Sequence, residues 1–218
     1  MIYYKTPNHS LALIPKSGCS TMARCVIKNF YPDTEYLIQN AAYPEGKGPD
    51  SIMWQSFAPK EKHPSKPTVA LIRNPVDRFV SAMSQVNLMD VDAAIYSMLN
   101  GTDIQMAKGK LNISKNSHFR LQVKWLVPDT KLYRFPDHLQ EAAIQLGMQI
   151  PLPVVNAASR PKPTLTPQQQ QIVEQYYAED IVLYDSIVSP GIVTGIVWSQ
   201  YQETTAPDNT TPPEEYIP

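Results

Sequence analysis

Short apolar runs alternate along this chain with segments whose apolar residues recur at helical spacing. Two such pairs come early: residues 11–14 precede a helix-compatible segment at 22–30, and residues 69–72 precede a second one that starts at Pro75. Short apolar runs beside turn residues predict buried strands, and apolar residues three or four apart predict helices. Because strands that alternate with helices favour a parallel sheet, the pattern predicts an α/β fold whose central parallel sheet is flanked by helices.

The rest of the chain continues this alternation. Strands are predicted at 34–39, 51–54, 131–135 and 191–198, and helices at 90–99, 117–127, 136–148 and 166–179. Residues 40–67 are rich in proline and glycine and predict mostly loop, where substrate contacts can lie. In the segment 117–127, a helix would place His118 and Gln122 on one face, which we expect to look into a cleft.

Length and composition fit a single sizeable domain. The chain has 218 residues, of which 43% are hydrophobic and 18% charged, as in globular proteins. We expect one domain at 1–188 and an extension at 189–218 that is partly disordered, with poor order from Ala206 onward. The sequence has no apolar run of membrane-spanning length and no signal-peptide pattern, so we expect a cytoplasmic protein that does not bind membranes. Cys19 and Cys25 are expected to be free thiols.

Charge is unevenly distributed, although the net charge is only −1. Positions 1–162 hold all 19 basic residues and 12 of the 20 acidic ones, a net charge of +7. The capacity to bind anions therefore lies in the first three quarters of the chain. We find no basic stripe with interleaved aromatic residues, and a nucleic-acid partner is not expected.

The turn after the first predicted strand has the composition of an anion-binding loop. It reads Pro15-Lys-Ser-Gly-Cys-Ser-Thr21 and leads into the first predicted helix. Helix starts present unpaired backbone N–H groups and the positive end of the helix dipole to phosphate or sulfate oxygens. Lys16 adds a cation, Gly18 permits close approach, and three side chains add hydroxyl donors: Ser17, Ser20 and Thr21.

This loop differs from that of nucleoside triphosphatases. Their motif places lysine directly after its second glycine, whereas here Lys16 lies two residues before Gly18. The kinase or triphosphatase interpretation loses most of its support. An ordinary turn with a surface lysine stays an alternative for this stretch when it is considered alone.

The second strand-to-helix unit places a cation where ligands of parallel sheets bind. Arg73 ends the strand, Asn74 can cap the following helix, and Pro75 suits its first turn. Arg78 and Ser81, three residues apart, can face the same side as Arg73. A guanidinium with a neighbouring hydroxyl suits a phosphate monoester.

Together the two stretches resemble the nucleotide-binding motifs of sulfotransferases that use 3′-phosphoadenosine 5′-phosphosulfate (PAPS). The resemblance rests on residues 15–21 and on Arg73-Asn-Pro-Val-Asp-Arg-Phe-Val-Ser81. It implies a P-loop-like three-layer sandwich, with the 3′-phosphate held by Arg73 and Ser81. The 5′-phosphosulfate would be held by the first loop, that is by Lys16, Ser17, Gly18, Cys19, Ser20 and Thr21. Cys19 departs from the family, where many members have threonine.

Later segments resemble the carbohydrate-type (family 2-like) branch of these enzymes. They are Asn116-Ser-His-Phe-Arg-Leu-Gln122 and three stretches at 155–160, 165–167 and 177–184, so that the resemblance covers roughly residues 8–185. It implies sulfation of a hydroxyl acceptor, a carbohydrate or another small molecule. The acceptor itself and the oligomeric state stay open.

The resemblance also suggests which residues take part in catalysis. Lys16 can stabilise charge on the bridging oxygen or merely anchor the nucleotide, and His118 is our first candidate for the base because histidine titrates near neutral pH. Rival bases before the second motif are Glu45, Asp50 and His63. Arg160 and Lys162 can close on the nucleotide or form a solvated loop. His9 and His138 are expected to be structural, and no metal ion is expected because no cluster has ligand spacing.

Three functions are therefore compared. The first is a PAPS-dependent sulfotransferase. The second is a nucleotide kinase of related P-loop architecture, which the missing Gly-Lys-Ser/Thr sequence disfavours. The third is a non-catalytic nucleotide-binding module that uses the long loop or the tail to hold a partner.

Overall fold

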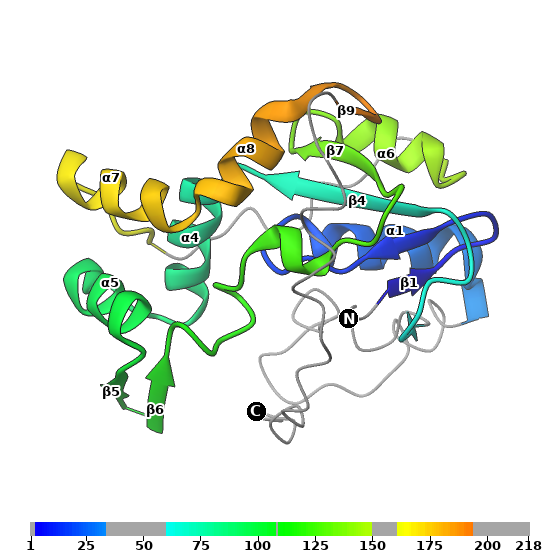
Figure 1. Cartoon of the computed structure of the whole chain (residues 1–218). Helices are drawn as coiled ribbons and strands as arrows, with labels where there is room; N and C mark the ends of the chain where they lie inside the picture. Colours follow the sequence, from blue (N-terminus) through cyan, green and yellow to red (C-terminus); the bar gives the residue numbers. More distant parts are fainter. Residues whose placement is uncertain (1–2, 34–59, 108, 150–160, 194–218) are drawn as a thin grey trace.

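The computed structural model describes residues 3–33, 60–107, 109–149 and 161–193. A five-stranded sheet runs through the centre of the molecule in the order β3-β1-β2-β4-β7 (Figure 1). Its strands are short and come from the whole first two thirds of the chain: β1 (Tyr3–Lys5), β2 (Ser10–Ala12), β3 (Lys60–Glu61), β4 (Thr68–Arg73) and β7 (Lys131–Phe135). With helices on its faces, the protein is a mixed α/β fold.

The sheet is mixed rather than wholly parallel. β2, β4 and β7 run parallel, with Leu11 opposite Val69 and Leu71 opposite Tyr133. β1 pairs antiparallel with both β2 and β3, so the prediction of a parallel sheet is wrong at this edge. Only residues 6–9 join β1 to β2, which is too few for the crossover connection that parallel neighbours require. The three parallel strands end at the same edge of the sheet.

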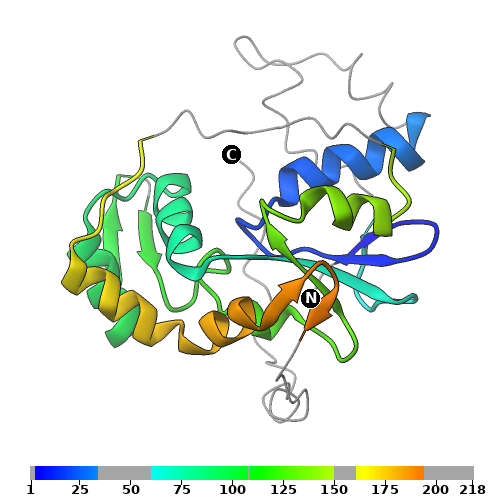
Figure 2. The same cartoon turned by 90° about the horizontal axis from the view of Figure 1, so that it is seen from above.

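Both faces of the sheet are covered (Figure 2). Helices α1 (Cys19–Phe30) and α6 (Leu139–Gln145) lie on one side, and α8 (Ala178–Ser186) lies on the other. Side chains of β4 alternate between these sides, with Val69 and Leu71 in the core under α1 and α6. Their neighbours Ala70 and Ile72 pack in the opposite core with Leu183 of α8.

A second group of helices packs beyond the carboxyl end of β4. It comprises α4 (Pro75–Gln85), α5 (Val91–Asn100) and α7 (Pro167–Tyr176), beside a hairpin of β5 (Asp103–Met106) and β6 (Gly109–Asn112) (Figures 1 and 2). Its core contains Phe79, whose ring centroid lies 5.7 Å from that of Phe119 and 6.3 Å from that of Tyr177. A hairpin of β8 (Ile187–Ser189) and β9 (Ile192–Val193) follows α8 and spans the boundary expected at residue 188.

Three helices of the described segments begin at side-chain caps, including the predicted cap of α4. The Asn74 side chain accepts hydrogen bonds from the N–H groups of Val76 and Asp77, with Pro75 in the first turn of α4. The Asp90 side chain accepts the Ala93 N–H at the start of α5. Thr166 forms a reciprocal capping box at the start of α7. The cap at Asn74 fixes the direction of the chain directly after Arg73.

Other boundaries differ from the prediction. Helix α1 begins at Cys19 rather than at Met22, α6 begins at Leu139 rather than at Pro136, and the helix predicted at 166–179 is interrupted at Tyr177. The α-helix predicted at 117–127 is wrong, since this stretch contains only the short 3₁₀ helix η2 (Gln122–Trp125). The Asp180 carboxylate accepts the N–H groups of Gln122 and Val123, which an α-helix beginning at Ser117 would use internally. The strands predicted at 34–39 and 51–54 lie outside the described residues.

The structure also bears on the cysteines and on membrane-spanning helices. Cys19 and Cys25 are both free, as predicted. Within the described segments, no helix is both long enough and apolar enough to cross a bilayer.

Candidate functional site

The two motifs predicted to hold an anion lie side by side at the carboxyl ends of β2 and β4. The Arg73 guanidinium donates from Nη1 to the backbone carbonyl of Lys16, 3.2 Å away. Arg78 of α4 donates from Nε to the carbonyl of Pro15 over 3.0 Å. Since these residues are 57 and 63 positions apart in the sequence, the contacts are products of the parallel pairing of β2 with β4.

Two residues give the first loop its shape. Lys16 has a φ of 67° and Gly18 a φ of 84°. Both values lie in the left-handed region, which residues other than glycine rarely adopt. A Cβ on Gly18 would lie 2.7 Å from Cε2 of Phe135, so only glycine fits against the end of β7. Backbone strain at a non-glycine residue such as Lys16 is characteristic of functional loops.

A third element, the η2 segment, joins the two motifs. Oε1 of Gln122 accepts hydrogen bonds from the Ser17 hydroxyl and from the Arg73 N–H, each 3.0 Å long. Nε2 of the same amide donates to the Arg73 carbonyl over 2.8 Å. Because the Ser17 hydroxyl is occupied inside the protein and Ser17 is only 3% exposed, it fixes the loop, and the anion would have to be held by the loop's other donors.

Arg78 does not face the proposed ligand as the sequence suggested. Its side chain is fully buried, donates to the carbonyls of Pro15 and Arg120, and lies 3.8 Å from the carboxylate of Asp180. Because Arg78 and Ser81 are three residues apart, their side chains lie on the same face of α4. This spacing does not show which part of the protein that face packs against. The role of Arg78 is therefore to hold the first loop against α4.

Arg73 keeps part of its guanidinium without a partner. Its Nε is buried and makes no hydrogen bond among the described residues, and its Cζ lies 5.7 Å from the centre of the Phe135 ring. Burial lowers the pKa of Arg73, and the nearby Arg78 lowers it further while Asp77 acts in the opposite direction. A buried donor without an acceptor costs free energy, which an anionic ligand at this position would recover.

The face of α4 that carries Ser81 lies toward the first loop. Gln85 Oε1 lies 3.4 Å from the Lys16 ammonium, and Arg78 contacts Pro15. Ser81 is three residues after Arg78 and four before Gln85, so it shares this face. It is 7% exposed. That Ser81 and Arg73 together face a phosphate stays a prediction, because the contacts described here join α4 to the first loop through Arg78 and Gln85.

The Cys19 thiol occupies the inner side of the loop. Its Sγ lies 2.9 Å from the carbonyl oxygen of Ile14, to which the thiol donates. Burial raises the pKa of the thiol, although the nearby backbone N–H groups of Lys16, Cys19 and Ser17 act against this. The Ser17 N–H itself donates to the Ile14 carbonyl over 3.2 Å and closes the turn, so the donors that an anion could meet here are those at the N-terminus of α1.

His118 lies close to the positive charges of the loop. Burial, with smaller contributions from Lys16 and Arg78, lowers the pKa of His118 to about 4. Its Nδ1 lies 3.1 Å from Oδ1 of Asn116, which can only accept a hydrogen bond, so we assign the proton to Nδ1 and the lone pair to Nε2. At neutral pH the imidazole is an uncharged group with one basic nitrogen available.

The lowered pKa of His118 makes stability depend on pH. The unfolded chain takes up a proton near pH 6.5 and the folded protein only near pH 4, so stability should fall as the pH drops through this window. The loss should reach about 2–3 kcal/mol at pH 4.5. Urea unfolding at pH 7 and pH 4.5 measures it, and in His118→Gln the pH-dependent loss should shrink by that amount. An unchanged loss in the variant would show that His118 is not buried beside these cations.

The remaining candidates are placed less closely or not at all. Glu45, Asp50 and Arg160 lie outside the described residues. His63 is exposed and precedes the amino end of β4, at the edge of the sheet opposite Arg73, so the structure does not bring it to the loops. Lys162 is exposed. His9 contacts Gln145, and Nδ1 of His138 accepts the Arg134 N–H at the start of α6, which supports structural roles for both.

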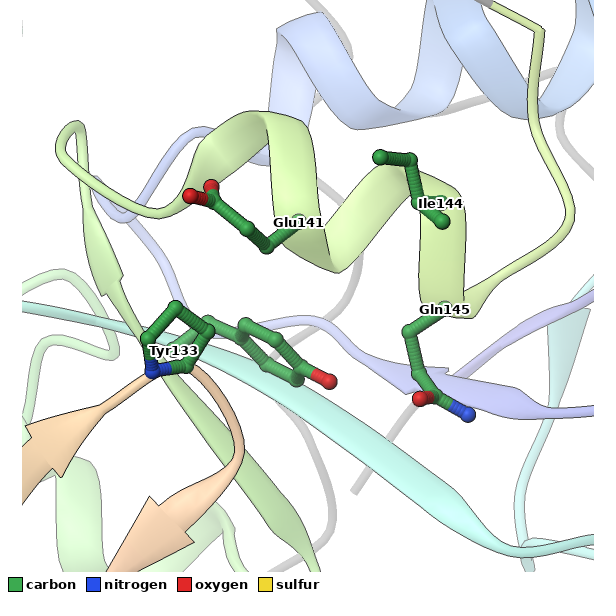
Figure 3. Close-up of a pocket in the computed structure, with 5 residues that line it drawn as sticks. Tyr133, Glu141, Ile144 and Gln145 are labelled. Atoms are coloured by element: carbon green, nitrogen blue, oxygen red, sulfur yellow. The ribbon is translucent and has the colours of Figure 1, made fainter.

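A hollow of about 380 Å³ lies elsewhere, between α6, the end of β8 and β7. Glu141, Ile144 and Gln145 of α6 stand over it, and Tyr133 of β7 lies beneath them (Figure 3). Its fifth lining residue is Pro190. None of the predicted site residues lines this hollow. No group of three His, Cys, Asp or Glu side chains in the described ranges is arranged to hold a metal ion.

The sequence did not predict that Arg78, Gln122 and Asp180 form a buried network that holds the two loops together. Gln122 and Asp180 both fall in segments that carry the resemblance to sulfotransferases, which was the available signal, but their contacts could not be read from spacing. Comparison of the chain with protein-family models, with curated proteins and with solved structures finds no match.

Proposed function

We propose that this protein is a sulfotransferase that moves a sulfuryl group from PAPS to a hydroxyl acceptor, a carbohydrate or a small molecule. The observation that carries the proposal is the hydrogen bond from Arg73 to the Lys16 carbonyl, which joins the two motifs expected to grip the two phosphate-bearing ends of one nucleotide. We further propose that the sheet and the helices on both its faces form a P-loop-like three-layer sandwich. The site then lies at the edge where parallel strands end.

The charges around the loops favour a ligand with several negative charges. Lys16, Arg73 and Arg78 lie close together. Arg78 contributes to the lowered pKa of Arg73, and both Lys16 and Arg78 contribute to the lowered pKa of His118. Two carboxylates oppose this charge: Asp180, which is buried and pairs with Arg78, and Asp77, which acts on Arg73. An anion with a phosphate at each end would balance the excess positive charge and satisfy the buried Nε of Arg73.

The residues present fit the proposed donor. The N–H groups at the N-terminus of α1 would hold the 5′ end, and Arg73 with Ser81 would hold the 3′-phosphate. The donor would supply the sulfuryl group. Lys16, which contacts Gln85, would stabilise negative charge on the bridging oxygen as the S–O bond to the 5′-phosphate breaks.

His118 would take the proton of the acceptor hydroxyl while the new S–O bond forms. Its Nε2 carries the lone pair, and the imidazole stays uncharged at neutral pH because burial and, to a smaller extent, the neighbouring cations oppose protonation. A bound polyanion would offset these cations and raise the pKa of His118, which makes it a stronger base in the complex than in the free protein.

Cys19 offers an independent test of where the nucleotide binds. Burial raises the thiol pKa of Cys19, and that of Cys25 to about 11, so both should alkylate slowly at pH 7.5. Saturating adenosine 3′,5′-bisphosphate should slow iodoacetamide modification of Cys19 by at least roughly tenfold, since the loop would be covered. Peptide mass spectrometry follows both residues, with the buried Cys25 as the internal control. Binding of the nucleotide without protection of Cys19 would contradict this placement.

Activity is tested with PAPS labelled in its sulfuryl group and a panel of sugars, polysaccharides and simple alcohols. The proposal predicts transfer of the label to at least one acceptor class and release of adenosine 3′,5′-bisphosphate, both abolished in His118→Gln. Binding of the bisphosphate without transfer to any acceptor would favour the non-catalytic module instead. Transfer of phosphate from ATP under the same conditions would favour the kinase.

A further inference from the structure

Gln122 has the geometry of a clamp between the two loops. Its side chain is fully buried and uses both ends of its amide, accepting from Ser17 and Arg73 and donating to the Arg73 carbonyl. Ser17 belongs to the first loop, whereas Arg73 ends β4. One amide therefore makes three hydrogen bonds that span both halves of the proposed nucleotide site.

The backbone that carries this amide is itself held from behind. Both oxygens of the buried Asp180 carboxylate accept backbone N–H groups, Oδ2 from Gln122 over 2.8 Å and Oδ1 from Val123 over 3.0 Å. Arg78, which pairs with Asp180, also grips Pro15 of the first loop. The clamp is thus anchored on α8, which carries none of the predicted nucleotide ligands, and on α4, which follows the second loop and carries Ser81.

We propose that Gln122 is a positioning residue that sets the spacing between the two loops, so that one nucleotide can reach both at once. The inference rests on the proposed function, because it presumes that the ligand carries phosphate at both ends. Gln122 itself would touch neither the nucleotide nor the reacting atoms. Its effect would be to keep the second phosphate site at the right distance once the first is filled.

The physical basis is the gain from binding two connected groups. A ligand held at one end presents its other end at a high effective concentration, provided that the second site is already in place. When the two loops can move apart, that gain is reduced by the cost of ordering them. A ligand with a single phosphate uses one loop only and does not depend on the spacing.

The experiment compares three nucleotides by calorimetry: adenosine 3′,5′-bisphosphate, AMP and adenosine 3′-phosphate. The parent should bind the bisphosphate more tightly than either monophosphate. In Gln122→Met, which keeps the side-chain volume but loses all three hydrogen bonds, bisphosphate affinity should fall by about tenfold or more and each monophosphate affinity by less than about threefold. Ser17→Ala removes a single bond and should shift affinities the same way by a smaller factor.

Controls separate positioning from loss of stability. Ser97 is also a fully buried polar residue and bonds to Thr102 and Ile113 in the helical part of the protein, away from both loops. Ser97→Ala should lower the unfolding midpoint while leaving all three affinities unchanged. If Gln122→Met is too unstable to study, the three nucleotide affinities of Ser17→Ala test the proposal.

The outcomes distinguish the two proposals. If all three affinities fall by the same factor in the variants, or none falls, Gln122 does not set the spacing and the inference is overturned while the proposed function stands. If the parent shows no preference for the bisphosphate over the monophosphates, the proposed function itself fails and the inference fails with it.

Discussion

Replacing Arg78 by methionine should lower the free energy of unfolding by roughly 3–5 kcal/mol. The change removes two hydrogen bonds to backbone carbonyls and leaves the buried Asp180 carboxylate without its cationic partner. Burial already raises the pKa of Asp180, and Arg78 is one of the groups that oppose this. Urea unfolding at pH 7 followed by circular dichroism measures the effect.

Arg120 provides a matched control for Arg78. It is exposed, and its backbone carbonyl, which accepts the Arg78 bond, is retained in Arg120→Met. This variant should lie within about 1 kcal/mol of the parent, the loss being confined to its stacking over Trp125. If Arg78→Met proves as stable as Arg120→Met, the buried polar network does not hold the first loop in place.

Replacing Lys16 by methionine should lower kcat for sulfuryl transfer by roughly 100- to 1000-fold, as removal of a group that stabilises transition-state charge does elsewhere. Affinity for adenosine 3′,5′-bisphosphate should fall by less than about tenfold, because backbone N–H groups and Arg73 would still hold the nucleotide. The reason for this split is that charge on the bridging oxygen develops only as the bond breaks.

The measurement is steady-state kinetics with PAPS beside calorimetry on the same variant. Lys115→Met, at an exposed lysine, is the control and should match the parent in both. A Lys16→Met protein whose nucleotide affinity falls by the same factor as its kcat/KM, with kcat unchanged, would make Lys16 an anchor rather than a catalytic group. The sequence alone leaves both of these roles open.

The sequence was informative wherever the physics is local. An apolar run that ends on Arg73, followed by a capping Asn74, is a pattern within a few neighbouring residues, and the structure has both the strand end and the cap. Because two such units in an α/β chain bring their strand ends to one edge, the juxtaposition of Lys16 with Arg73 could also be expected.

Contacts between distant segments could not be predicted in this way. Gln122 bonds to residues 49 and 105 positions away, and to Asp180 at 58 positions, with no periodicity that could signal such partners. These same contacts explain the principal error in secondary structure, since Asp180 takes the N–H groups that a helix at 117–127 would need. The prediction that Arg78 faces the ligand was wrong, because helical spacing shows which residues share a face and not what that face packs against.

We propose that the loops at Lys16 and Arg73 form one site for a single adenosine with phosphate at both ends. Calorimetric titration of the full chain with adenosine 3′,5′-bisphosphate, repeated with Arg73→Ala, tests this arrangement. We predict one site per chain in the parent and at least roughly tenfold weaker binding in the variant, the loss expected for a charge-assisted contact to phosphate. No detectable binding to the parent, or equal affinity of Arg73→Ala and parent, would contradict the claim.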